Sequence, residues 1–271
     1  MYKYNELKAK YKDKKKMVKI KTQNVRSKMV KMGNNTPKGD PSLKNTEGHI
    51  IDVKGATKVY LKGKVQKIAL YNVNFEIKKG EFVVILGQSG SGKTTLLNLL
   101  SALDRPTSGD IIVENTNLSC LSNTDLTTFR RNYVGFVFQS YNLLSELNAR
   151  DNVEIGRRLQ KDGNLRLDVQ ELFERVGITD ELNSSVGELS GGQLQRVALI
   201  RALSKNPSII FADEPTGALD SKTSDKVMKL FKEINKKYKT TIVLVTHNNQ
   251  VTKMADKIIN VSDGKVTVQH V

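Results

Sequence analysis

The stretch Gly87-Gln88-Ser89-Gly90-Ser91-Gly92-Lys93-Thr94 decides the fold of this chain, because it fits the spacing G-x-x-x-x-G-K-[ST]. Its glycines let the backbone curl, so that successive N–H groups point inward around phosphate oxygens. A continuous apolar run over 82–86 precedes it, and a leucine-rich stretch over 96–100 follows it. This order predicts a buried strand, a phosphate-binding loop and then a helix.

The loop also supplies the polar groups that a nucleoside triphosphate and its metal need. Lys93 is predicted to reach the β- and γ-phosphates, and the Thr94 hydroxyl is placed to ligate Mg²⁺. Thr95 follows in the first turn of the helix, whose N-terminal dipole faces the anion. We therefore expect ATP and Mg²⁺ to bind here, and we include Thr95 among the nucleotide-binding residues.

Apolar runs typical of buried strands recur along the chain, with helical stretches between them. Such alternation of strand and helix predicts an α/β fold with a largely parallel central sheet. Residues from about 140 to 190 contain no such run, and they predict an inserted helical subdomain. The runs lie at 50–53, 68–77, 82–86, 134–138, 208–212 and 241–246.

Two carboxylates, Asp213 and Glu214, follow directly after one of these runs. The ligand crevice of a parallel sheet opens at the C-terminal ends of its strands. Asp213 is suited to bind Mg²⁺ through water, and Glu214 is suited to polarise the attacking water. With the phosphate-binding loop, the two carboxylates predict the second half of a hydrolytic site.

A second anion site is predicted at Leu189-Ser190-Gly191-Gly192-Gln193, where a serine and two glycines open a long helix. The first N–H groups of a helix have no partner within it and can bind an anion. By itself the motif is equally compatible with an ordinary N-cap serine followed by turn glycines. A single phosphate-binding loop does not need a second anion site, which makes this motif the most discriminating one in the chain.

Leu189 to Gln193 resembles the signature of the ATP-binding-cassette (ABC) ATPases, and the likeness covers about residues 49–271. Gln139 matches the family's Q-loop, and His247 matches its switch histidine. Tyr60 matches the aromatic residue that stacks on adenine. Asp220, in the stretch Ala218-Leu219-Asp220, matches the D-loop.

The resemblance implies a role for each matching residue. Glu214, His247 and Gln139 are expected to be catalytic, and Thr94, Gln139 and Asp213 are expected to hold Mg²⁺. No other metal is expected, since the three histidines and one cysteine lack the spacing of metal ligands. The expected nucleotide-binding residues are Tyr60, Gly87, Gln88, Ser89, Gly90, Ser91, Gly92, Lys93, Thr94, Thr95, Ser190, Gly191, Gly192, Gln193 and Asp220.

The resemblance also implies an architecture and partners. The expected fold is a P-loop NTPase (RecA-like) core with an N-terminal antiparallel β subdomain and an inserted α-helical subdomain. Two chains would face each other head to tail with two ATP molecules between them. Integral membrane permease subunits would be separate partners, which would place the chain at the cytoplasmic face of the cell membrane.

Finer details of the sequence resemble one branch of the family. The stretches 103–109, 135–144 and 213–220 are similar to those of ATPases for lipoprotein release, macrolide export and antimicrobial-peptide resistance, and of a cell-division ATPase. Leu194 and the stretch 185–187 depart from the family pattern and leave the substrate class open. Export or extraction of a substrate is the main hypothesis. A mechanical or signalling ATPase, and a soluble ATPase acting on nucleic acid or cofactor assembly, are the alternatives.

The charge is concentrated at the N-terminal end. The net charge is +16, and residues 1–48 carry 14 Lys or Arg against 4 Asp or Glu. We interpret 1–48 as a basic, disordered leader before an ABC ATPase domain at 49–271. A contact of the leader with anionic lipid is the sharper alternative. We expect no nucleic-acid partner, because the basic excess lies mainly in the leader. We also expect no membrane-spanning segment, because no apolar run approaches the roughly 18 residues that such a helix needs.

Overall fold

The computed structural model describes residues 39–62 and 65–271. Residues 39–271 form one compact unit, and residues 1–38 are not described. Most of the predicted leader therefore lies outside the described residues. Its last part, residues 39–48, is described and forms turns against the following sheet.

A six-stranded sheet forms the centre of the described unit. Its strand order is β10 (Lys265–His270), β9 (Lys257–Ser262), β3 (Phe82–Leu86), β8 (Thr241–Val245), β7 (Ile209–Asp213) and β6 (Val134–Phe138). All neighbouring strands are parallel except β9 and β10, which form a hairpin. The prediction of an α/β fold with a mostly parallel sheet is confirmed.

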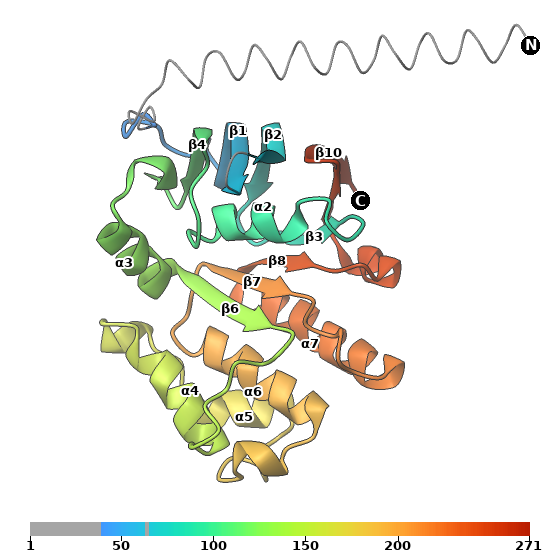
Figure 1. Cartoon of the computed structure of the whole chain (residues 1–271). Coiled ribbons are helices and arrows are strands. Elements are labelled where there is room, and N and C mark those ends of the chain that lie inside the picture. Colours follow the sequence, from blue (N-terminus) through green and yellow to red (C-terminus); the bar gives the residue numbers. More distant parts are fainter. Residues whose placement is uncertain (1–38, 63–64) are drawn as a thin grey trace, which may run out of the picture. The chain divides into compact units, whose positions relative to one another are not determined.

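Helices cover both faces of this sheet, and each face has its own hydrophobic core. Along β3, Phe82 and Val84 belong to one core, while Val83 and Ile85 belong to the other. This alternation explains why β3 is a continuous apolar run, since both of its faces are buried. Figure 1 shows α2 on one side of the sheet and α4 to α7 on the other. The helices are α2 (Lys93–Leu100), α3 (Asn123–Tyr133), α4 (Ala149–Arg158), α5 (Val169–Val176), α6 (Gly191–Leu203) and α7 (Ser221–Tyr238).

A second, antiparallel sheet packs over α2, as the resemblance implied. Its order is β2 (Val65–Lys78), β1 (His49–Lys62), β4 (Ser108–Val113) and β5 (Thr116–Asn117). β1 and β2 are 14-residue strands and run beyond the apolar runs that predicted them. Val53, Leu70 and Ile111 from this sheet share a core with Leu96 and Leu100 of α2. The fold therefore holds the helix of the phosphate-binding loop between two sheets.

The predicted helical insertion consists of α4, α5 and short turns. Between about 140 and 190 the described residues form no strand beyond an isolated bridge between Asn148 and Ser185. Leu172 and Phe173 of α5 are fully buried and join the core beneath the sheet, together with Val197 of α6. The 3-10 turns of the described residues are η1 (Leu118–Cys120), η2 (Gly163–Leu165), η3 (Val186–Glu188) and η4 (Asn249–Met254).

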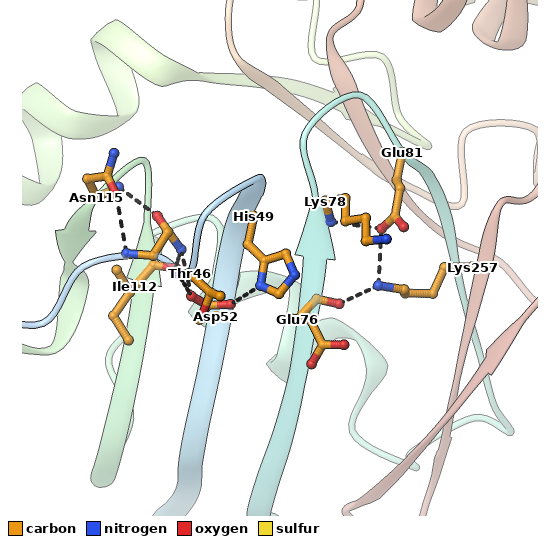
Figure 2. A network of polar contacts seen from close by, with 10 residues as sticks. Thr46, His49, Asp52, Glu76, Lys78, Glu81, Ile112, Asn115 and Lys257 are labelled. Atoms are coloured by element: carbon orange, nitrogen blue, oxygen red, sulfur yellow. Dashed lines mark hydrogen bonds and ion pairs between the residues drawn. The ribbon is translucent and has the colours of Figure 1, made fainter.

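Polar contacts fasten the antiparallel sheet to its neighbours (Figure 2). Lys257 of β9 is fully buried, and its ammonium donates to the Glu76 carbonyl of β2 at 2.7 Å and pairs with Glu81 at 3.1 Å. The Asp52 carboxylate accepts from the Thr46 N–H at 2.6 Å and contacts the His49 ring at 2.9 Å. The hydrogen bond from Lys257 to Glu76 links β9 to β2, and Glu81 balances the buried charge of Lys257; removing one partner of a buried ion pair typically costs about 3–5 kcal/mol, because the other charge is left unpaired.

In residues 39–62 and 65–271, no helix is both long enough and apolar enough to cross a membrane.

Candidate ATP-binding and hydrolysis site

Four parts of the predicted site follow the C-terminal ends of four parallel strands. Phe138 of β6, Asp213 of β7, Val245 of β8 and Ile85 of β3 are aligned by strand pairing. The chain therefore delivers the phosphate-binding loop, Gln139, Glu214 and His247 to the same edge of the sheet. This edge is where ligands bind in open parallel sheets.

The phosphate-binding loop has a backbone that only glycine accepts at two of its positions. Gly92 caps α2 with φ at 116°, and a Cβ there would lie 2.7 Å from the Ala69 carbonyl oxygen. Gly87 has φ at 158°, and its Cβ would meet the Val261 carbonyl at 2.3 Å. The glycines of the motif are thus required by close approach of β2 and β9, as well as by the curl of the loop.

Lys93 and Ser91 lie within this loop with their polar groups turned toward it. The Lys93 ammonium donates to the carbonyls of Gly87 at 2.8 Å and Gln88 at 3.0 Å. The buried hydroxyl of Ser91 has no hydrogen-bond partner among the described residues. Buried polar groups are normally satisfied, and a phosphate oxygen would satisfy this one. The loop therefore fits a phosphate group.

A pocket of about 410 Å³ extends from the phosphate-binding loop to Tyr60. It brings together seven of the predicted nucleotide-binding residues, at positions 60 and 90–95. The pocket also includes residues that were not predicted, from β2 and from the β9–β10 turn. The sequence signal for that turn is Asp263-Gly264, a pair typical of tight hairpins, with both residues at positive φ. The additional residues are Lys67, Ile68, Ala69, Asp263 and Gly264.

Tyr60 is held at the far end of this pocket by two polar residues. Its hydroxyl donates to Asp104 at 3.0 Å, and the Lys58 ammonium lies 5.0 Å from the centre of its ring. Lys58 also pairs with Asp104 at 2.6 Å. Burial raises the pKa of the Tyr60 hydroxyl, and Asp104 contributes to this rise. The tyrosine is thus a protonated donor at neutral pH.

Asp213, at the end of β7, is a carboxylate whose pKa is raised by its surroundings. Burial is the main cause that raises its pKa, and the charge of Glu214 adds to this effect. Lys93 acts in the opposite direction, which places its charge near Asp213. A buried carboxylate with a raised pKa is characteristic of functional sites. A cation bound next to Asp213 would stabilise its charged form.

Glu214 and His247 are in direct contact. The His247 Nδ1 lies 3.1 Å and 3.0 Å from the two carboxylate oxygens of Glu214. An ionised carboxylate can only accept, so the Nδ1 nitrogen carries the proton in this contact. Glu214 has φ at 46°, in the left-handed region, and its N–H donates to the Val245 carbonyl at 2.9 Å. A non-glycine residue held there stores strain of the kind found at active sites.

Gln139 and Asp220 lie next to the segment that follows Glu214. The Gln139 side chain is exposed and approaches Gly217, where a Cβ would lie 2.9 Å from its amide nitrogen. Asp220 caps α7, and its carboxylate accepts from the Thr223 N–H at 3.0 Å. A pocket of about 260 Å³ lies beside this segment, and it is lined by Glu214, Gly217, Leu219 and His247 among others.

Ser190 to Gln193 form the start of α6 and do not line the pocket at the phosphate-binding loop. Ser190 and Gln193 make a reciprocal capping box, with the Ser190 N–H donating to the Gln193 side chain at 2.8 Å. A Cβ on Gly191 would meet Leu219, and one on Gly192 would meet Thr223. The predicted signature therefore lies beside the D-loop, apart from the pocket of its own chain.

The predicted magnesium ligands have suitable chemistry. Thr94, Gln139 and Asp213 offer a hydroxyl, an amide and a carboxylate oxygen, and oxygen ligands are what Mg²⁺ prefers. Thr94 follows Lys93, whose charge reaches Asp213, and Gln139 follows the strand that pairs with Asp213. Within the described ranges, no group of three or more His, Cys, Asp or Glu side chains gathers as a metal site.

Comparison with known proteins identifies the relatives of this site. A family model described as ABC transporter matches residues 70–217. A putative ABC transporter ATP-binding protein of Mycoplasma pneumoniae is 47% identical over 225 residues, which are 83% of this chain and 48% of that protein. The macrolide export ATP-binding/permease protein MacB of Bartonella quintana is 41% identical over 229 residues, which are 82% of this chain and 34% of MacB.

A solved structure agrees with these matches. It is the dimeric, post-hydrolysis state of an ATP-binding cassette of Methanocaldococcus jannaschii, bound to ADP and phosphate. Its TM-score is 0.74 at 41% identity, and the match covers 81% of this chain and 98% of that chain. This chain spans about half the length of its Mycoplasma relative and about a third of the length of MacB.

Proposed function

The chain belongs to the family of ABC transporter ATP-binding proteins, and from this premise we propose that it binds and hydrolyses ATP to drive transport through separate membrane subunits. The proposal rests mainly on the observation that the predicted phosphate-binding and catalytic residues lie at one edge of the parallel sheet. Strand pairing brings the phosphate-binding loop, Gln139, Glu214 and His247 to that edge.

In this proposal, the pocket at the phosphate-binding loop holds the nucleotide. Backbone N–H groups of the loop, the start of α2 and the Lys93 ammonium bind the phosphates. Lys93 exchanges its contacts with the Gly87 and Gln88 carbonyls for phosphate oxygens. Tyr60, at the other end of the pocket, stacks on the base. The unpartnered Ser91 hydroxyl supports the proposal, because an incoming phosphate oxygen would complete its hydrogen bonding.

Hydrolysis needs a group that takes a proton from water as the water oxygen attacks the γ-phosphorus. Glu214 is the proposed base, and ADP is the leaving group. Its contact with the His247 Nδ1–H occupies both carboxylate oxygens. The imidazole must therefore move, or share the carboxylate, before Glu214 can accept the proton. Thr94, Gln139 and Asp213 would hold Mg²⁺, which neutralises charge on the phosphates when bound.

We propose that the signature at Ser190 to Gln193 completes the site of a second chain. It does not line the pocket at its own phosphate-binding loop, and it has the N–H groups of a helix start to offer to an anion. The solved cassette of similar sequence is a dimer with ADP and phosphate bound. ATP would then join two half-complete anion sites, and loss of the γ-phosphate would release them.

Transport is the favoured use of this ATPase, and the partners are membrane permeases. MacB joins an ATP-binding part to a permease in its name, and it exports macrolides. The similar region of this chain is the ATP-binding part, so the proposed location is the inner face of a membrane, on a permease. The molecule transported stays open, because the permease selects it. A lipid contact of the basic leader remains a hypothesis about residues outside the described ranges.

Co-purification tests this function against its alternatives. The tagged chain is expressed with the permease genes that neighbour its own, and it is purified from detergent-solubilised membranes. We expect an integral membrane protein to be recovered in a fixed ratio, and its presence to change the rate of ATP hydrolysis. Recovery of nucleic acid in place of a membrane protein would instead favour the soluble alternative. A membrane partner whose complex hydrolyses ATP without moving any substrate would favour the mechanical one.

A further inference from the structure

We propose that Lys58 and Asp104 are positioning residues that hold the Tyr60 ring as a fixed platform for the nucleotide base. The inference rests on the proposed function, because it assigns residues that support base stacking. Neither Lys58 nor Asp104 lines the pocket that Tyr60 faces. Both residues therefore act on the tyrosine from outside the pocket and have no contact of their own with the nucleotide.

The three side chains form one connected unit. Asp104 divides its two oxygens between its partners, with Oδ1 accepting from Lys58 at 2.6 Å and Oδ2 accepting from the Tyr60 hydroxyl at 3.0 Å. The Lys58 ammonium also lies over the Tyr60 ring, 5.0 Å from its centre. Tyr60 is thus held both at the end of its ring and over its face. A cation at this distance from an aromatic ring is attracted to its π-electrons.

Lys58 and Asp104 are themselves well anchored. The Lys58 side chain is 13% exposed, and its ammonium has a second acceptor in the Arg105 carbonyl at 2.7 Å. Oδ1 of Asp104 also accepts from the Arg105 N–H at 2.7 Å. Burial would raise the pKa of Asp104, but hydrogen bonds from Lys58 and Arg105 lower it below its ordinary value. Asp104 is therefore a carboxylate at neutral pH and a strong acceptor for the tyrosine.

The anchor connects the base platform to the phosphate-binding loop through α2. Asp104 lies just after α2, where its N–H donates to the Asn98 carbonyl within that helix at 3.0 Å. The start of the same helix follows Gly92 and carries Lys93. The same helix thus carries Lys93 in its first turn and is hydrogen-bonded, just past its last turn, to Asp104, which accepts from the Tyr60 hydroxyl.

Holding the Tyr60 ring in place favours nucleotide binding, because Tyr60 is 39% exposed and lies near the end of a strand. An exposed aromatic side chain samples several rotamers, and a ligand that must select one of them binds more weakly. The Lys58–Asp104 pair removes most of this cost in advance. The pair therefore contributes to ATP affinity without touching ATP.

The test measures nucleotide affinity by calorimetry for Asp104→Ala and Lys58→Met. We expect each change to weaken ATP by about 3- to 10-fold, the worth of ordering one side chain. Tyr60→Ala should weaken ATP by about 5- to 150-fold, the span of a base–aromatic stack. Tyr60→Phe keeps the ring and the Lys58 ammonium over it, and it should lose about 3-fold or less of the ATP affinity, since only the hydrogen bonds of the hydroxyl are removed.

Two further measurements separate positioning from a general structural role. In the Tyr60→Ala background, Asp104→Ala should change ATP affinity by less than about 2-fold, because the group that it positions is gone. Binding of inorganic tripolyphosphate, which has no base, should be the same in the parent and in both anchor variants. In both anchor variants, the affinity for GTP should fall about as much as the affinity for ATP, because every base presents a stacking face.

Lys232→Met is the matched control. Lys232 also pairs with an aspartate, Asp256, at 3.0 Å and lies over an aromatic ring, Phe82, at 5.1 Å. It belongs to α7 and lines none of the pockets at the proposed site. The control removes the same kind of contact, and ATP affinity should stay unchanged. If Asp104→Ala does not fold, Lys58→Met carries the same test.

The outcomes distinguish this inference from the function on which it rests. Unchanged ATP affinity in Tyr60→Ala would remove base stacking from the proposed function, and the platform with it. A large loss in Tyr60→Ala with no loss in Asp104→Ala and Lys58→Met would overturn the positioning role alone. Equal losses for ATP and tripolyphosphate would also overturn it, because they would show damage to the phosphate-binding loop.

Discussion

Replacing Lys93 with alanine is expected to abolish useful ATP binding. The ammonium now rests on the Gly87 and Gln88 carbonyls, at the centre of the phosphate-binding loop. A hydrogen bond to a charged partner contributes about 1.5–3 kcal/mol, and Lys93 is expected to contact two phosphates. The combined loss should lower ATP affinity by about 10²- to 10⁴-fold. Titration calorimetry with Mg-ATP measures this directly.

The matched control for this variant is Lys229→Ala. Lys229 is an exposed residue of α7, so its loss removes one positive charge without touching the loop. Its ATP affinity should equal that of the parent, which excludes a simple effect of net charge. Micromolar affinity retained by Lys93→Ala, together with a normal melting temperature, would contradict our assignment of the phosphate-binding loop.

Glu214→Gln is expected to lower the rate of ATP hydrolysis by about 10²- to 10⁴-fold, the span typical of a lost general base. Glutamine keeps the size and can still accept a hydrogen bond from His247, but it cannot take a proton from water. Binding should survive, because the phosphate-binding loop, Thr94 and Asp213 are unchanged. Phosphate release at saturating Mg-ATP measures the rate.

Glu233→Gln controls for the loss of a carboxylate elsewhere. Glu233 lies on the exposed face of α7, and its replacement should leave hydrolysis at the parent rate. If Glu214→Gln hydrolysed ATP within a factor of about ten of the parent, general-base catalysis by Glu214 would be wrong. In that case the strained backbone at position 214 would need another explanation.

The central sheet and the identity of the site residues could be predicted because they depend on local patterns. The runs at 82–86, 134–138 and 241–246 are apolar on both faces, which is typical of buried parallel strands. The structure places β3, β6 and β8 there. Gln139, Glu214 and His247 each follow a parallel strand within two residues, so the register of the sheet brings these three residues to one edge.

Other parts of the fold depend on contacts that no local pattern reveals. β9 and β10 form a hairpin that borders the phosphate-binding loop, and Val261 approaches Gly87 there. The turn pair Asp263-Gly264 signals the hairpin, but nothing in it indicates pairing with a strand more than 170 residues earlier. The role of Lys257 is similar, because a lysine in a sequence predicts an exposed side chain. Here Lys257 is fully buried, and the Glu76 carbonyl of β2 and the Glu81 carboxylate bind its ammonium.

The Tyr60 anchor shows the same limit within the site itself. Tyr60 could be assigned to the base from its place before the phosphate-binding loop, but Asp104 is separated from it by the whole of β2, β3 and α2. Only the fold brings the carboxylate to the tyrosine hydroxyl. In the sequence, Asp104 looks like an ordinary polar loop residue that follows a helix.

Each ATP is expected to bind between two chains, at the phosphate-binding loop of one and Ser190 of the other. The most direct test is the molar mass of Glu214→Gln, measured by size-exclusion chromatography with light scattering. Because this variant binds ATP without hydrolysing it, we expect a dimer in Mg-ATP and a monomer without nucleotide. Adding Ser190→Arg should return the protein to a monomer, since a bulky side chain blocks the helix start that faces the second chain's nucleotide. A Glu214→Gln protein that stays monomeric at saturating Mg-ATP, with binding verified by calorimetry, would contradict the two-chain site.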